Sequence, residues 1–163
     1  AVARGREPRS WDGVGWSGDR VQELDFWGSG LEVLAPQIGQ LTAVTYLNLA
    51  WCKLKELPPH IGQLTALTKL DLEDCEQLKE LPPQIGQLTA LTELRLRESG
   101  LEVLPPQIGR LTALTKLVLF NCKQLKELPP QVGELTALPT LILNGCEQLK
   151  ELPPQIGQLT ALT

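Results

Sequence analysis

Leucine and isoleucine recur along the chain at one repeated spacing. In residues 67–90 the apolar ladder consists of Leu67, Leu70, Leu72, Leu78, Leu81, Ile85 and Leu88. The alternation in Leu70-Asp71-Leu72 predicts a short strand with one buried face. The pair Pro82-Pro83 that follows is incompatible with the interior of a strand or a helix, so it predicts an extended return. Each unit is therefore expected to contain one short strand and a return.

The same unit of 23 or 24 residues occurs six times, at 21–43, 44–66, 67–90, 91–113, 114–137 and 138–161, and Leu162-Thr163 opens a seventh. Residues 1–20 precede the copies and are expected to form a partial N-terminal cap, with a disordered lead-in over residues 1–10. One unit cannot cover its own apolar face, so the copies are expected to stack into a solenoid. One glycine in each return predicts a tight turn there, at Gly39, Gly62, Gly86, Gly109, Gly133 and Gly157.

Each copy has the pattern L-x-x-L-x-L-x-x-C/S followed by L-x-x-L-P-x-x-I-G-x-L-T-A, which resembles the leucine-rich repeat family. The resemblance implies an α/β fold, a right-handed solenoid with a concave parallel sheet and short helical or 3-10 returns on the convex side. Copies with Cys-x-x-Leu-x-x-Leu-Pro, as at 75–82, are similar to repeats of plant intracellular disease-resistance receptors and Ras-group leucine-rich repeat proteins. The junction from Trp11 to Asp25 is similar to that of plant and algal receptor-type repeats, with Trp16 where those have a disulfide cysteine.

Composition narrows the possible functions. The 163 residues include 15 Lys and Arg against 19 Asp and Glu, a formal charge of -4, which argues against a nucleic-acid partner. No apolar run has the roughly 20 residues that cross a bilayer, so no membrane span is expected. His60 is the single histidine and is expected to be a solvated surface residue. An enzyme is therefore disfavoured, and no cofactor and no metal site are expected.

The four cysteines all occupy one position of the repeat, where Ser29 and Ser99 stand in two other copies. They are Cys52, Cys75, Cys122 and Cys146, spaced 23, 47 and 24 residues apart. This position predicts a structural ladder of buried S–H and O–H groups that donate to backbone carbonyls of the turn between coils. Unpaired thiols at this density fit a reducing compartment, so a cytoplasmic location is expected.

Differences between the copies concentrate on one face of the expected sheet. The fifth position of the unit reads Asp25, Asn48, Asp71, Arg95, Val118, Ile142; the seventh reads Trp27, Ala50, Glu73, Arg97, Phe120, Asn144; and the eighth reads Gly28, Trp51, Asp74, Glu98, Asn121, Gly145. The fifth and seventh positions face outward by the period of two. The exposed glutamines of the returns, such as Gln84 and Gln107, hardly change, so unselected drift does not explain this variation.

This variable face is interpreted as a ligand-binding surface. Its residues are the aromatic Trp27, Tyr46 and Trp51, the solvated acids Asp71 and Glu73, the basic Arg95 and Arg97, and the apolar Val118, Phe120 and Ile142. Exposed aromatic and Arg residues dominate binding energy at interfaces. The alternative is that these side chains simply cover one another across neighbouring strands.

Two functions remain open. The first is a protein- or peptide-recognition module that binds through its concave face, as the sensor or scaffold part of a larger protein. The alternative, found in families with similar repeats, is an intramolecular regulatory lid on an attached GTPase, kinase or nucleotide-binding domain. The pattern runs to Thr163 without a polar cap, so self-association through the C-terminal end is also expected.

Overall fold

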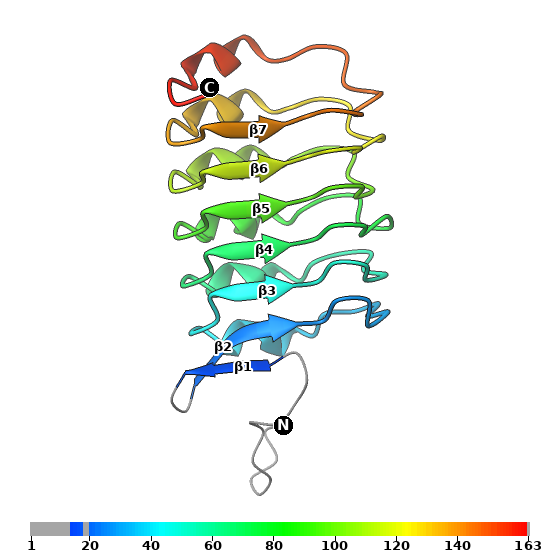
Figure 1. The fold of residues 1–163 in the computed structure, drawn as a ribbon, viewed down its shortest axis with the longest axis vertical. Helices are drawn as coiled ribbons and strands as arrows, with labels where there is room; N and C mark the ends of the chain where they lie inside the picture. Colours follow the sequence, from blue (N-terminus) through cyan, green and yellow to red (C-terminus); the bar gives the residue numbers. More distant parts are fainter. Residues whose placement is uncertain (1–13, 18–19, 163) are drawn as a thin grey trace, which may run out of the picture.

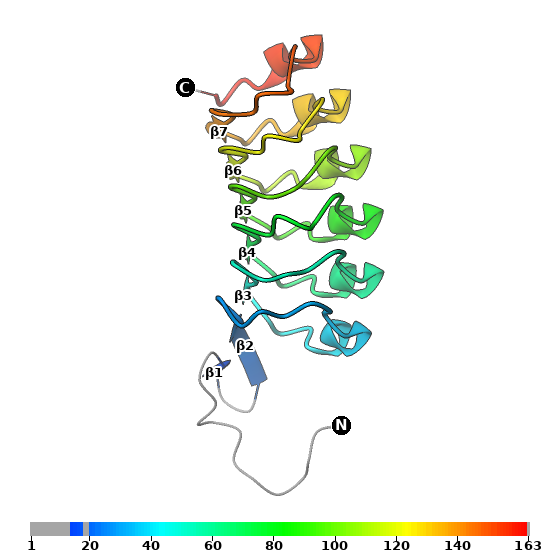
Figure 2. The ribbon, with the colours of Figure 1, turned by 90° about the vertical axis from the view of Figure 1, so that its right-hand side faces the viewer.

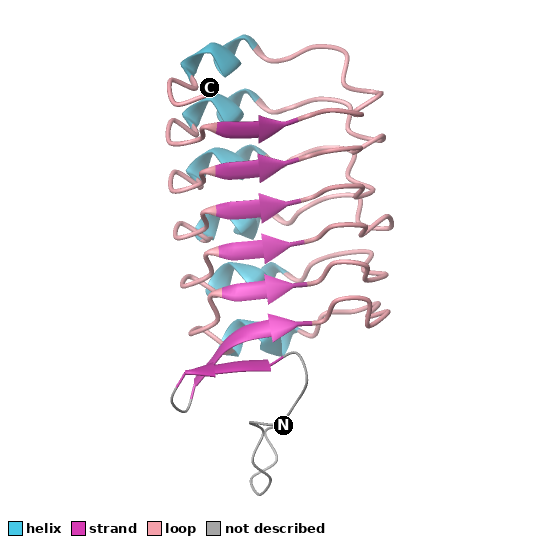
Figure 3. Ribbon diagram, viewed as in Figure 1, coloured by secondary structure: helices cyan, strands magenta, loops and turns pink. Residues whose placement is uncertain are grey.

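The chain forms a stack of coils, each with one strand, a turn, an extended stretch and a 3-10 helix (Figures 1 and 3). The computed structural model describes residues 14–17 and 20–162, with side chains from residue 20 onward, so the expected lead-in lies outside the described residues. The strands are β1 Val14–Ser17, β2 Arg20–Asp25, β3 Tyr46–Asn48, β4 Lys69–Asp71, β5 Glu93–Arg95, β6 Lys116–Val118 and β7 Thr140–Ile142. The 3-10 helices are η2 Pro36–Gln40, η3 Pro59–Gln63, η4 Pro83–Gln87, η5 Pro106–Arg110, η6 Pro130–Glu134 and η7 Pro154–Gln158.

All described strands belong to one sheet whose spatial order follows the chain from β1 to β7. Strands β2 to β7 are parallel, and β1 pairs antiparallel with β2. The sheet lines one side of the stack and the 3-10 helices line the opposite side (Figure 2). The predicted solenoid of short parallel strands with 3-10 returns is confirmed. Strand β1, within the expected cap, was not predicted.

The leucine ladder forms one continuous core between the sheet and the 3-10 helices. Leu117 and Leu119 of the fifth coil are fully buried. Leu141 and Leu143 occupy the same positions in the sixth coil but are only partly buried, because no coil follows it in the described part of the chain. Each fully buried leucine contributes roughly 1.5–3 kcal/mol. Stability therefore depends on the neighbouring coil rather than on the unit itself.

The glycine of each return has a different role from the one predicted. Gly86 and Gly109 lie inside their 3-10 helices without a positive φ, so the expected tight turn at these positions is wrong. A Cβ on Gly86 would lie 2.7 Å from the backbone oxygen of Gln107, and one on Gly109 would lie 2.6 Å from that of Gln131. Glycine is required because successive 3-10 helices approach too closely for a side chain.

Positive φ angles occur instead in the turn that follows each strand. One residue of each turn, at the eighth position of the unit, has this conformation: Gly28, Trp51, Asp74, Glu98, Asn121 and Gly145, with φ of 62°, 59°, 55°, 54°, 56° and 80°. Gly30, at the tenth position of the first unit, also has a positive φ of 70°. The variation seen at the eighth position in the sequence therefore has to satisfy a left-handed backbone.

Candidate recognition site

The parallel register aligns equivalent residues into columns across the outer face of the sheet. Asp71 lies opposite Asn48 in one neighbouring strand and opposite Arg95 in the other. A second column contains Glu23, Tyr46, Lys69, Glu93, Lys116 and Thr140. Tyr46, at this third position of the unit, was predicted to bind a ligand, whereas Glu93 and Lys116 at the same position were not predicted. The period of two was sufficient to find them, since the third, fifth and seventh positions share a face.

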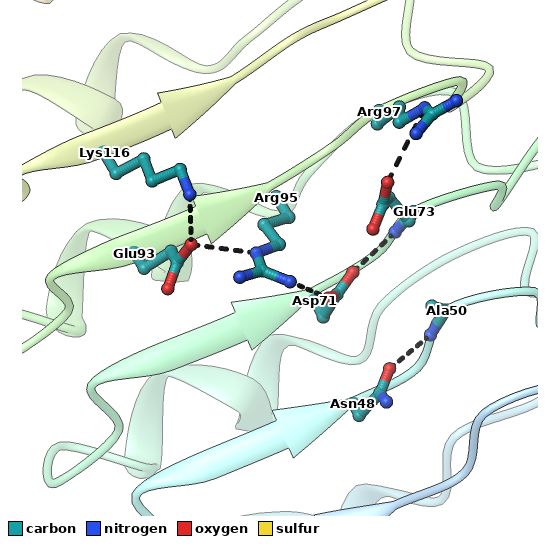
Figure 4. Close-up of polar contacts among 8 residues, drawn as sticks. All are labelled: Asn48, Ala50, Asp71, Glu73, Glu93, Arg95, Arg97 and Lys116. Atoms are coloured by element: carbon teal, nitrogen blue, oxygen red, sulfur yellow. Dashed lines mark hydrogen bonds and ion pairs between the residues drawn. The ribbon is translucent and has the colours of Figure 1, made fainter. Parts of the chain in front are cut away.

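Arg95 lies at the centre of an ion-pair network on this face (Figure 4). Its Nε donates to Glu93 Oε1 at 2.8 Å and its Nη1 donates to Asp71 Oδ2 at 3.4 Å. Lys116 Nζ lies 3.1 Å from the same Glu93 oxygen. The network joins β4, β5 and β6, so the position of the Arg95 guanidinium is set by side chains from two strands.

The two carboxylates of this network respond to it differently. Burial opposes ionisation of Glu93, but the hydrogen bonds from Arg95 and Lys116 outweigh it and lower the pKa of Glu93. Burial raises the pKa of Asp71, although the Glu73 N–H and Arg95 act in the opposite direction. The hydrogen bond to Glu93 also raises the pKa of Arg95, which therefore stays charged.

Asp71 differs from the solvated acid that the sequence predicted, because it is only 6% exposed. Its Oδ1 accepts the Glu73 N–H at 3.0 Å, and in the coil before it Asn48 Oδ1 accepts the Ala50 N–H at 3.0 Å. Asp25 Oδ1 accepts the Trp27 N–H in the same way at 2.9 Å. Asp or Asn stands at the fifth position of three successive copies, and this pattern in the sequence could have predicted the turn. In it the side-chain oxygen accepts the backbone N–H two residues later, at the end of the strand.

A shallow hollow of about 450 Å³ combines basic and apolar side chains. It is lined by Glu73, Arg95, Arg97, Lys116, Val118, Phe120 and Ile142. The Arg97 guanidinium carbon lies 5.2 Å from the centre of the Phe120 ring, and Arg97 Nε lies 3.7 Å from Glu73 Oε1. Phe120 is half-buried. The contact between Arg97 and Phe120 fits the alternative that these side chains cover one another across neighbouring strands. A concave surface nevertheless remains above them.

The aromatic residues at the N-terminal end do not join this hollow. Trp27 and Trp51 are 65% and 58% exposed, and neither lines it. Tyr46 is half-buried and lines a separate hollow of about 350 Å³ with Lys69, Asp71 and Arg95. Burial raises the pKa of the Tyr46 hydroxyl. The ten residues selected from the sequence therefore divide into a central charged network with Tyr46 beside it, a basic and apolar hollow, and an exposed tryptophan end.

The cysteines lie one above another along the solenoid, and each Sγ donates to a carbonyl of the previous coil. The contacts are Cys52 to Phe26 O at 3.3 Å, Cys75 to Leu49 O at 3.2 Å, Cys122 to Leu96 O at 3.0 Å and Cys146 to Leu119 O at 3.0 Å. Ser29 Oγ and Ser99 Oγ lie 3.6 and 3.5 Å from the Sγ atoms of Cys52 and Cys122. Burial raises the pKa of Cys75 to about 12 and that of Cys122 to about 11, so neither thiol is poised to act as a nucleophile.

In the described part of the chain, the His, Cys, Asp and Glu side chains form no group of three or more that could hold a metal ion. None of its helices has the length and apolar character needed to cross a membrane. His60 is exposed on η3.

Comparison with known proteins identifies the family. The family described as "Leucine-rich repeat region" matches residues 20–126 of this chain, so the chain belongs to the leucine-rich repeat family. No curated protein matches the chain. A leucine-rich repeat protein of Leptospira interrogans is 36% identical, with a TM-score of 0.62 over 82% of this chain and 39% of that one.

Two Arabidopsis receptor kinases have the same fold. HAESA, solved in complex with the peptide hormone IDA and the co-receptor SERK1, is 28% identical with a TM-score of 0.62 over 80% of this chain and 22% of that one. The ectodomain of SOBIR1 is 23% identical with a TM-score of 0.63, over 82% and 73% of the two chains, and shows the fold alone. The chain spans well under half the length of the Leptospira and HAESA chains.

Proposed function

We propose that this chain is a recognition module that binds a peptide or an extended segment of a protein across the outer face of its sheet. The hollow formed by Arg97, Phe120 and their neighbours is the centre of the proposed site. Leucine-rich repeat domains generally mediate protein or peptide binding, and HAESA was solved with a peptide hormone.

The observation that carries the proposal is the combination of cations and apolar side chains in one hollow. Arg95 is held by Glu93 and Asp71, whereas Arg97 is 48% exposed at its side chain and pairs with the neighbouring Glu98 at 3.1 Å and, more loosely, with Glu73 at 3.7 Å. The pair with Glu98 is solvent-exposed, with 37% of the Glu98 side chain accessible, so an acidic group of a ligand can take the place of Glu98 on Arg97. Val118, Phe120 and Ile142 cover an apolar side chain beside it. The ligand class is a segment with a carboxylate next to an apolar residue.

The test begins with selection of peptides from a random display library on the immobilised chain. Selected peptides are synthesised, and their affinities are measured for the wild type, Arg97→Gln and Phe120→Ala. Each substitution is expected to weaken binding roughly tenfold or more, as for central interface residues. A tenfold loss corresponds to about 1.4 kcal/mol.

Arg110→Gln is the matched control, because Arg110 is exposed on η5 at the opposite side of the coil. It removes the same charge and should leave the affinity unchanged. Unfolding midpoints of all three variants are measured to show that the fold persists. Equal affinities for wild type, Arg97→Gln and Phe120→Ala would overturn the proposal, as would an equal loss in Arg110→Gln.

We also propose a cellular location and a second role for the chain. Similarity to repeats of intracellular disease-resistance receptors and Ras-group proteins would place the chain in a reducing, cytoplasmic compartment, and the buried unpaired thiols support this location. Arg97 and Phe120 would serve an attached domain equally well as a separate ligand, so the variants above also test the lid role when they are made in the full-length gene product.

A further inference from the structure

A second surface lies on the flank of the solenoid, away from the sheet. It is a groove of about 1150 Å³ that runs across four coils, where the extended stretches lead into η4, η5, η6 and η7. Figure 2 shows these stretches stacked one above another. The groove is formed by the Pro-Pro pair of each coil and by the two residues before it, and none of the residues selected from the sequence for ligand binding lines it.

The floor of the groove is apolar and partly open to solvent. Each coil contributes its pair of prolines, at 82–83, 105–106, 129–130 and 153–154. Val103 is 38% exposed and Leu152 is 47% exposed within the groove. A continuous exposed apolar strip of this kind usually marks an interaction surface.

The rim of the groove is acidic and carries no compensating charge. Glu80, Glu127 and Glu151 line it, and no Lys or Arg is among its lining residues. None of the ion pairs within the described residues involves these three glutamates. The residue before each rim residue does not line the groove; these residues, Lys79, Glu102, Lys126 and Lys150, form an outer column. In this outer column Lys126 Nζ pairs with Glu102 Oε2 at 2.6 Å, whereas no ion pair of the described residues involves the glutamates of the groove.

The distance between the glutamates of the rim indicates which backbone conformation of a bound peptide would fit them. Val103 and Glu127 form a parallel β-bridge, so the coils on this flank are spaced like strands, about 4.8 Å apart. Glu80 and Glu127 are two coils apart, which corresponds to about 9.6 Å. A polyproline II helix rises about 3.1 Å per residue with three residues per turn, so its residues i and i+3 lie on one face about 9.3 Å apart.

We propose that the flank groove binds an extended polypeptide in the polyproline II conformation with Arg or Lys at positions i and i+3. One cation pairs with Glu80 and the next pairs with Glu127, with Glu151 one coil further along the rim, while the intervening prolines pack on the Pro-Pro pairs of the coils. This site is independent of the proposed site on the sheet.

The test uses fluorophore-labelled peptides and fluorescence anisotropy at low ionic strength, where exposed charge pairs are least screened. The probe is Pro-Arg-Pro-Pro-Arg-Pro-Pro, and the matched control, Pro-Pro-Arg-Arg-Pro-Pro-Pro, has the same composition with adjacent arginines. The probe should bind more tightly than the control. The double variant Glu127→Gln, Glu151→Gln should weaken binding of the probe roughly three- to tenfold.

Two further variants test whether the probe binds in the groove itself. Glu102→Gln, in the outer column, should leave probe binding unchanged, and so should Arg97→Gln on the sheet. Equal affinity for the two peptides, no binding at 1 mM, or equal losses in Glu102→Gln and the double variant would each overturn the proposal. Dimerisation of the chain that is abolished by Val103→Asp would place a second copy in the groove and would also overturn it.

Discussion

The guanidinium of Arg97 lies over the ring of Phe120, with the guanidinium carbon 5.2 Å from the ring centre. The two residues are on adjacent coils, at the same seventh position of the repeat, so the parallel register brings them together. A double-mutant cycle of Arg97→Gln and Phe120→Ala should give a coupling of about 0.5–1 kcal/mol in the free energy of unfolding, the value of an exposed cation–π pair. Urea denaturation measures it, and the pair Arg110→Gln with Phe120→Ala should show no coupling.

Asp71 and Glu93 should have opposite effects on the pH dependence of stability. The pKa of Asp71 is raised in the folded state, so its contribution to stability is present at low pH and is lost as the pH rises through the folded pKa. Asp71→Asn preserves the acceptor for the Glu73 N–H, as Asn48 does for Ala50. The gain in stability of Asp71→Asn over the wild type should therefore be larger at pH 7 than at pH 3.

The contribution of Glu93 to stability should depend on pH in the opposite direction to that of Asp71. Its folded pKa is lowered, so its contribution is present at neutral pH and is lost as the pH falls through that value. Glu93→Gln should destabilise the chain at pH 7 and have little effect at pH 3. Parallel pH series of urea denaturation for both variants measure this, and a loss for Glu93→Gln that is constant with pH would contradict it.

The thiols should be slow to react in the folded chain. Burial raises the pKa of Cys75 to about 12 and that of Cys122 to about 11, and it also raises the pKa of Cys146; the thiolate is the reactive form. A chromogenic disulfide reagent at pH 8 should label Cys146, which is only half-buried, before Cys75 and Cys122. After denaturation all four cysteines should react promptly. Four prompt equivalents in the native state would contradict a buried ladder.

Two glycines of identical local structure should respond differently to the same substitution. Gly109→Ala places a Cβ 2.6 Å from the backbone oxygen of Gln131 and should cost about 1–3 kcal/mol. Gly157→Ala meets nothing within 4 Å and should be neutral or stabilising by up to about 1 kcal/mol. Thermal unfolding of the two variants measures the difference, and equal effects would show that intrinsic helix geometry, rather than the next coil, requires the glycine.

The backbone at Trp51 is a further test of strain. Its φ of 59° is unfavourable for a residue with a Cβ, by about 1 kcal/mol relative to Gly. Trp51→Gly should therefore be more stable than Trp51→Ala by about 1 kcal/mol. At Lys123, an exposed residue without a positive φ, the order should reverse, because Gly loses more conformational freedom on folding. Chemical denaturation of the four variants gives both comparisons.

The sequence alone determined the repeat, the strand positions and the residues of the core. Leu70, Leu72 and their equivalents carry this information, because the period of two in a strand and the fixed length of the unit leave one arrangement that buries the leucines between successive coils. The same argument identified the variable outer face and the common position of the cysteines. These features can be predicted from the residue pattern of a single unit and from comparison of neighbouring copies.

Tertiary structure decided what depends on the exact approach of one coil to the next. The burial of Asp71, the ion pairs that join Glu93 to Arg95 and Lys116, and the close contact of Gly109 with Gln131 all depend on register and separation between coils. The flank groove arises only when four extended stretches stack, since each contributes one pair of prolines and one rim residue. The sequence shows which side chains each coil contributes, but the register and separation of the coils determine which of those side chains are in contact.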